Sequence, residues 1–182
     1  AFSDLYRAEW FKVENTQESY SNASHSNSWD HWEPLKYSET FFGTGTNVRS
    51  DVVPALFLPV LLNGEAVGTM RYKVRFSIDG ETFETPGAES MDPWGISDKV
   101  HRISKEGNTD FPILNSAFAL CNNPFIYASE SPDHQDVFDN QSERFLGADC
   151  ADFCIAAQRL AGYHGFFYTS STNLKTQLEE IV

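Results

Sequence analysis

The clearest pattern in the chain is an alternation of apolar and polar positions over residues 71–78. Tyr72, Val74, Phe76 and Ile78 occupy every second position, and basic or polar side chains lie between them. A period of two is typical of a β-strand with one buried face. Asp79-Gly80 follows and is a strong signal for a two-residue hairpin turn, so the chain around Phe83 is expected to return as the partner strand.

The segment before this strand also favours β structure. Residues 52–62 are apolar and β-branched, and Asn63-Gly64 after them predicts a turn. Together these signals predict an antiparallel β unit over residues 48–104. Residues 1–50 are polar and aromatic, with an Asn/Ser-rich patch at 19–28, and are interpreted as an arm that packs against the rest. Residues 1–104 are therefore assigned to an N-terminal arm plus an antiparallel β module.

Two later segments show helical periodicity. Residues 108–122 carry apolar side chains at roughly helical spacing and end at Asn122-Asn123-Pro124, a stop signal. A second helix is predicted from Asp149 to Ala161, with Gly162 where a left-handed C-cap is favoured. Its apolar stripe, expected to be buried, is Phe153, Cys154, Ala157 and Leu160. The side chains expected to face away are Asp152, Gln158 and Arg159, the last two of them exposed.

Charge and cysteine content narrow the classes of partner. The chain has 182 residues, with 13 basic and 26 acidic side chains and a net charge of −13. Such a surface repels phosphate backbones, so no nucleic-acid partner is expected. No run of ~18 apolar residues occurs, so no membrane span is expected. The three cysteines cannot form a complete disulfide framework, and free thiols are the default interpretation.

Candidate chemistry concentrates at Cys150. In the first turn of the predicted helix, unpaired backbone N–H groups and the helix dipole favour an anion. This position favours the nucleophilic thiolate. Asp149 suits the N-cap, where its carboxylate would accept N–H groups of the first turn. The alternative is that Cys150 is a small core residue that begins a structural helix.

The surrounding sequence resembles the NlpC-type family of papain-like cysteine peptidases, which cleave peptides of the bacterial cell wall. The resemblance covers roughly residues 108–175. It rests on a helix followed by three segments in the family's order: Asn123-Pro124-Phe125-Ile126-Tyr127-Ala128-Ser129, then Gly147-Ala148-Asp149-Cys150-Ala151-Asp152-Phe153, then Leu160-Ala161-Gly162-Tyr163 leading to Tyr168-Thr169-Ser170.

The resemblance implies an α+β fold in which the β module precedes a papain-like domain. Residues 105–182 would form the N-terminal part of that domain, apparently incomplete at its C-terminus. Cys150 would be the nucleophile, and Cys121 and Cys154 would be packing residues. The implied substrate is a peptide or a peptidoglycan stem peptide, with no cofactor and no metal. The implied location is extracytoplasmic, and Ala1 in place of Met is compatible with a processed export signal or with a trimmed chain.

The chain departs from the family at two functional positions. The tyrosine that helps to hold the oxyanion aligns with Phe125, and Tyr127, two residues on, is the candidate for an oxyanion or substrate contact. No histidine stands where the family has its base, which a thiolate nucleophile needs within hydrogen-bond reach. The histidines present are His25, His31, His101, His134 and His164. Either the chain stops before that histidine, which is the preferred explanation, or the base has moved, or the protein is inactive.

Three functions therefore compete. The first is a cysteine peptidase or amidase that acts through a Cys150 thiolate. The second is a catalytically inactive, peptidase-like binding or assembly protein. The third is a β-sandwich-like adaptor unrelated to peptidases. His31 has Asp30 and Glu33 nearby and could bind a metal, but no second cluster has ligand spacing, so no metal site is expected.

Overall fold

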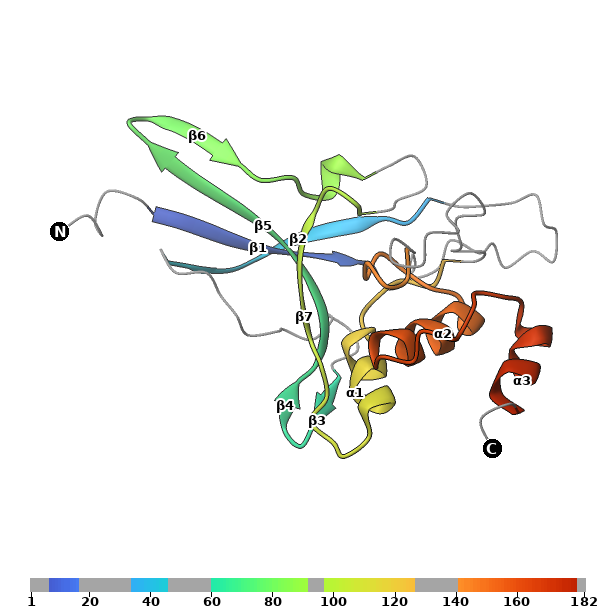
Figure 1. Cartoon of the computed structure of the whole chain (residues 1–182). Coiled ribbons are helices and arrows are strands. Elements are labelled where there is room, and N and C mark those ends of the chain that lie inside the picture. Colours follow the sequence, from blue (N-terminus) through green and yellow to red (C-terminus); the bar gives the residue numbers. More distant parts are fainter. Residues whose placement is uncertain (1–6, 17–33, 46–59, 92–96, 127–140, 180–182) are drawn as a thin grey trace.

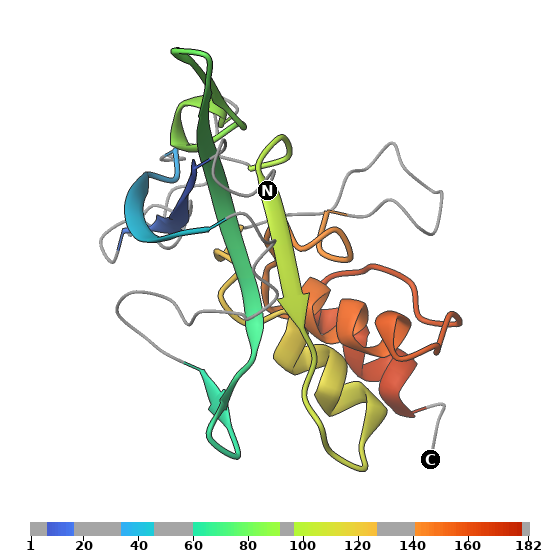
Figure 2. The same ribbon diagram turned by 90° about the vertical axis from the view of Figure 1, so that its left-hand side faces the viewer.

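The computed structural model describes residues 7–16, 34–45, 60–91, 97–126 and 141–179. They form an α+β fold with a five-stranded antiparallel sheet and three helices (Figure 1). Figures 1 and 2 both place helices α1 (Pro112–Ala119) and α2 (Cys150–Leu160) side by side near one end of the sheet. Helix α3 (Ser171–Glu179) lies beyond α2 (Figure 1). The expected α+β class is confirmed at this level.

The sheet is organised around one long strand, β5 (Gly68–Ile78). One edge of β5 pairs with β1 (Arg7–Asn15), which pairs in turn with β2 (Tyr37–Thr44). The other edge of β5 pairs with two strands. The first half of β5 pairs with β7 (His101–Lys105), and the second half of β5 pairs with β6 (Glu81–Glu84). Residues 7–15 and 37–44 of the predicted arm are thus integral strands of the sheet.

The predicted hairpin at Asp79-Gly80 is confirmed. Both residues have positive φ, 51° and 86°, and Phe76 pairs with Phe83 across the two strands. Asn63-Gly64 likewise turns the chain with positive φ, between the short strands β3 (Leu61–Leu62) and β4 (Glu65–Ala66). Positive φ at both central residues matches the right-handed twist of the flanking strands. A short 3-10 turn, η2 (Ala88–Ser90), follows β6.

The sheet and the helices are joined at the start of β5. The Thr69 N–H donates to the Cys121 carbonyl at 2.8 Å, and the Thr69 hydroxyl donates to the Ala119 carbonyl at 2.8 Å. Gly68 permits this approach, because a Cβ there would lie 2.8 Å from the Cys121 carbonyl oxygen. Arg71, fully buried, donates to Glu14 and to the Asn122 carbonyl, each at 3.0 Å. The chain after α1 is therefore held directly against β5.

The burial of α2 corrects the sequence prediction. Ala157 is buried as expected, and Phe153 and Leu160 are partly buried against Leu120 and its neighbours. Cys154 is exposed, however, and both Asp152 and Arg159 are buried. The prediction fails because α2 is covered on a second side, where Arg159 pairs with Glu143 at 2.6 Å and donates to the Phe166 carbonyl at 2.9 Å.

In the described part of the chain, no helix combines the length and the apolar character needed to cross a membrane.

Candidate functional site

Cys150 is the first residue of α2, and it is exposed. Asp149 occupies the N-cap with extended backbone angles, and its Oδ1 accepts the N–H groups of Ala151 and Asp152, both at 2.9 Å. The Phe153 N–H donates to the Asp149 carbonyl at 2.9 Å. Within the described ranges, no acceptor receives the Cys150 N–H. That N–H is therefore available beside the thiol, where an oxyanion would form.

The segment leading to Cys150 is fixed by pairing with the chain after α1. Phe125 and Ala148 form a parallel β-bridge, in which the Ile126 N–H donates to the Ala148 carbonyl and the Ala148 N–H donates to the Pro124 carbonyl, each at 3.2 Å. A Cβ at Gly147 would lie 2.3 Å from Ile126 Cδ1 and 3.1 Å from the Pro124 carbonyl oxygen, with φ at +151°. Glycine is therefore required there, and two of the motifs noted in the sequence lie side by side.

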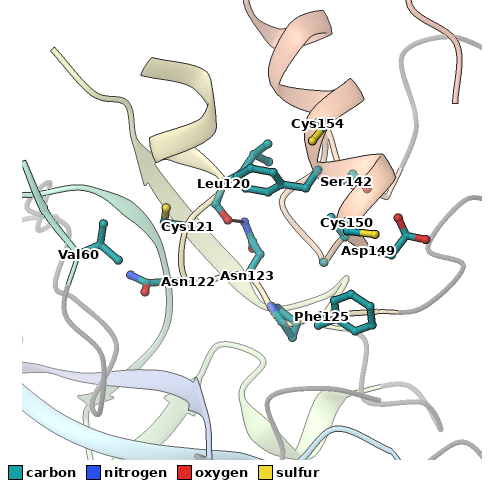
Figure 3. A pocket seen from close by; sticks show the side chains of 14 residues that line it. Val60, Leu120, Cys121, Asn122, Asn123, Phe125, Ser142, Asp149, Cys150 and Cys154 are labelled. Carbon is teal, nitrogen blue, oxygen red and sulfur yellow. Dashed lines mark hydrogen bonds between the residues drawn. The ribbon is translucent and has the colours of Figure 1, made fainter. Parts of the chain in front are cut away.

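A pocket of about 540 Å³ opens at Cys150 (Figure 3), which is within the usual ~300–1,000 Å³ of ligand sites. It lies between the end of α1, the segment after it and the first turns of α2. Its described lining residues are Val60, Leu120, Cys121, Asn122, Asn123, Pro124, Phe125, Ser142, Gly147, Ala148, Asp149, Cys150, Phe153 and Cys154. Val60, Cys121 and Asn122 lie on the side away from Cys150 and Asp149 (Figure 3).

All three cysteines line this pocket, but their environments differ. Burial raises the pKa of the Cys121 thiol. Cys154 is exposed overall, but partial loss of hydration, with a smaller contribution from the neighbouring Cys150, raises the pKa of its thiol. A raised pKa lowers the fraction of nucleophilic thiolate at both of these cysteines. Cys150 alone combines exposure with the helix N-terminus.

A buried polar cluster supports α2 from its other side. Glu143 accepts hydrogen bonds from Arg159 Nε at 2.6 Å and from the Tyr168 hydroxyl at 2.8 Å. Burial, reinforced by the Glu143 carboxylate, raises the pKa of Tyr168. Glu143 stands seven residues before Cys150 in the chain. The cluster therefore anchors the loop that delivers Cys150 to the pocket.

The structure describes only some of the residues that the sequence predicts as partners of Cys150. Asp149 is at the N-cap as expected, whereas Tyr127, His25, His31 and His134 lie outside the described residues. His101 is stacked on Tyr72 in the sheet, and His164 follows the far end of α2. Neither of these two lines the pocket. Over the described ranges, no group of three or more His, Cys, Asp or Glu side chains is arranged to hold a metal ion.

Sequence reasoning missed the polar side chains on the pocket wall. Asn122 and Asn123 were interpreted only as part of a helix stop signal. Asn122 is 5% exposed, and neither its Nδ2 nor the buried Oδ1 of Asn123 has a hydrogen-bond partner within the part of the chain that the structure describes. Two consecutive asparagines before a proline could have suggested a polar site, but nothing in the sequence shows that they line the same pocket as Cys150.

Comparison of the chain with protein-family models, with curated proteins and with solved structures finds no match.

Proposed function

We propose that the protein is a cysteine hydrolase that cleaves amide bonds of bacterial cell-wall peptides through the Cys150 thiolate, outside the cytoplasm, with α1 and α2 belonging to an NlpC-type papain-like domain. The observation that carries the proposal is the placement of Cys150. It is an exposed thiol at a capped helix N-terminus and opens into a pocket of ligand size. The pairing of Phe125 with Ala148 supports the family assignment, because it joins two of the family-like motifs.

The chemistry follows from this placement. The thiolate attacks the amide carbonyl, forming a C–S bond, and the Cys150 N–H donates to the resulting oxyanion. Collapse expels the amine, which must take up a proton, and leaves an acyl-enzyme. Water then releases the acid and regenerates the thiol. The Asp149 carboxylate accepts hydrogen bonds from two backbone N–H groups, which offset part of its negative charge beside the thiol.

The test is acylation of the native protein by p-nitrophenyl acetate, followed by intact mass measurement and peptide mapping. One acetyl group on Cys150 is expected, and Cys150→Ser should abolish it. Thr172→Ala, at an exposed first-turn position of α3, is the matched control and should acylate as the unmodified protein does. Digestion of purified peptidoglycan then measures the release of new amino groups. Acylation confined to other residues would contradict the proposal.

The second candidate is a binding protein that retains the peptidase-like site without turnover. The observation that favours it is that neither described histidine lines the pocket. It predicts binding of soluble peptidoglycan fragments with no amino groups released, and no change in binding for Cys150→Ser. Release of amino groups that depends on Cys150 would exclude it.

A further inference from the structure

The pocket at Cys150 is walled mainly by apolar side chains. They come from three separate parts of the chain: Val60 before β5, Leu120 with Pro124 and Phe125 after α1, and Phe153 on α2. Phe153 also packs against the buried Leu120. A wall of this kind gains free energy by removing the apolar surface of a ligand from water.

The described wall of the pocket carries one ionisable side chain that is charged at neutral pH, and it lies at the Cys150 end. Among its described lining residues, Asp149 is the only one with a side chain ordinarily ionised at neutral pH, and its Oδ1 already accepts two N–H groups. Cys121 and Cys154 have raised thiol pKa values and remain neutral. An ionised group at the far end, near Val60 and Asn122, would lose its hydration without gaining a charged partner among the described lining residues, which is strongly unfavourable.

Two neutral amide atoms complete the wall. Asn122 Nδ2 is a buried donor and Asn123 Oδ1 a buried acceptor, each without a partner among the described residues. Asn123 Nδ2 is held by the Leu120 carbonyl at 2.8 Å, so its side chain is fixed between α1 and α2 (Figure 3). Both atoms are enclosed, so they add neither a charge nor an exposed hydrogen-bonding group to the mainly apolar wall.

We propose that this pocket binds the acyl part of the substrate and selects an uncharged, mainly apolar acyl group. The inference rests on the proposed function and deepens it. With the carbonyl carbon at Cys150 Sγ, the acyl chain extends past Phe153 and Leu120 toward Val60 and Asn122. In a peptide substrate, the residue on the acyl side of the cleaved bond therefore carries no charged side chain.

Activated esters test this selectivity without a leaving amine. The Cys150 thiolate forms a C–S bond, the C–O bond breaks, and p-nitrophenolate leaves with the bonding electrons and reports the rate. Esters of acetate, butyrate and hexanoate vary the apolar length. Monoesters of adipate and of 6-(trimethylammonio)hexanoate add a negative or a positive end group to a six-carbon chain. Rates with Cys150→Ser are subtracted from each.

The acylation rate constant should rise by about fourfold per methylene from acetate to hexanoate, as expected for burial of CH₂ groups. Both charged esters should react about 100-fold more slowly than hexanoate, because the described lining residues at the far end from Asp149 offer the end group no charged partner. Equal rates for hexanoate and adipate would overturn the inference and leave the proposed function intact. Failure of every ester to acylate Cys150 would overturn both.

A charge placed in the wall supplies a second test. Cys154→Lys, at an exposed position that lines the pocket, should raise the adipate-to-hexanoate rate ratio by about threefold to fivefold. The ratio cancels any general activation of Cys150 by the new charge. Gln158→Lys, one turn further along α2 and outside the lining, is the matched control and should leave the ratio unchanged. An equal change in both variants would contradict the assigned pocket.

Discussion

Arg71 in the central strand donates a hydrogen bond to the backbone carbonyl of Asn122, 3.0 Å away, in the wall of the pocket that contains Cys150. The same guanidinium pairs with Glu14 at 3.0 Å, and both side chains are almost completely buried. The sheet and the candidate site are therefore mechanically connected through one buried cation.

Arg71→Met should destabilise the protein by about 3–5 kcal/mol, because it leaves the buried Glu14 carboxylate without its partner. The double variant Arg71→Met with Glu14→Leu should be less destabilised than the single one, since the unpaired charge is removed as well. Arg75→Met, which breaks only half-exposed ion pairs, should cost less than about 1 kcal/mol. Urea unfolding measures all three, and a single Arg71 variant as stable as the Arg75 variant would be incompatible with this role.

Asp149 has two effects that two substitutions separate. Asn is as good an N-cap as Asp, so Asp149→Asn should change stability little, whereas Asp149→Ala should cost about 1 kcal/mol. Asp149→Asn should also speed the alkylation of Cys150 by anionic iodoacetate relative to neutral iodoacetamide, because it removes a negative charge next to the thiol. The ratio of the two alkylation rates measures this effect. An identical ratio for the Asn variant and the unmodified protein would show that the carboxylate charge does not act at the thiol.

The raised pKa of Tyr168 predicts that the folded protein loses stability at alkaline pH. Its pKa is raised in the folded protein, by burial first and then by Glu143, above the unfolded value of about 10. The folded state therefore holds its proton longer than the unfolded state. The contribution of Tyr168 is complete below that value and declines as the pH rises above it. Urea unfolding between about pH 8 and pH 11 should show a smaller decline for Tyr168→Phe; an unchanged decline would exclude Tyr168 as its source.

Gly68→Ala tests the close contact between β5 and the chain after α1. Gly68 has φ of +103°, and a Cβ there would lie 2.8 Å from the Cys121 carbonyl oxygen. Gly64 also has positive φ, +83°, but a Cβ there would meet no atom within 4 Å. Both substitutions incur backbone strain, so Gly68→Ala should cost at least about 1 kcal/mol more than Gly64→Ala. Equal losses of stability in the two variants would mean that β5 and the chain after α1 can move apart at no cost in free energy.

Local signals in the sequence predicted the local structure. Asp79-Gly80, the Asp149 cap and the Gly162 helix end each depend on a few neighbouring residues, and all three are confirmed. The strands of the arm were missed as strands. In β1 the register shifts at Trp10/Phe11, and the charged Lys12 and Glu14 are buried, so the usual alternation is absent.

Contacts between distant parts of the chain could not be predicted. The burial of Arg159 depends on Glu143, sixteen residues earlier, and on the chain around Phe166. The pocket likewise combines Val60 with residues around 120–125 and 142–154. A periodic pattern in the sequence does not indicate contacts between distant segments, because each residue alone is compatible with a solvent-exposed position. The position of Cys150 at a capped helix start depends only on the first turn of one helix, so it was accessible from the sequence, whereas the chemistry assigned to Cys150 stays a prediction.

Limiting alkylation of the native protein with iodoacetamide near neutral pH, followed by peptide mapping, tests the central claim most directly. Cys150 and Cys154 are both exposed, so accessibility alone predicts similar labelling. We expect preferential labelling of Cys150, because it stands at the N-terminus of α2, whereas partial loss of hydration and the neighbouring thiol raise the pKa of Cys154, and burial raises that of Cys121. Labelling of Cys154 or Cys121 at a rate equal to or greater than that of Cys150 would contradict it.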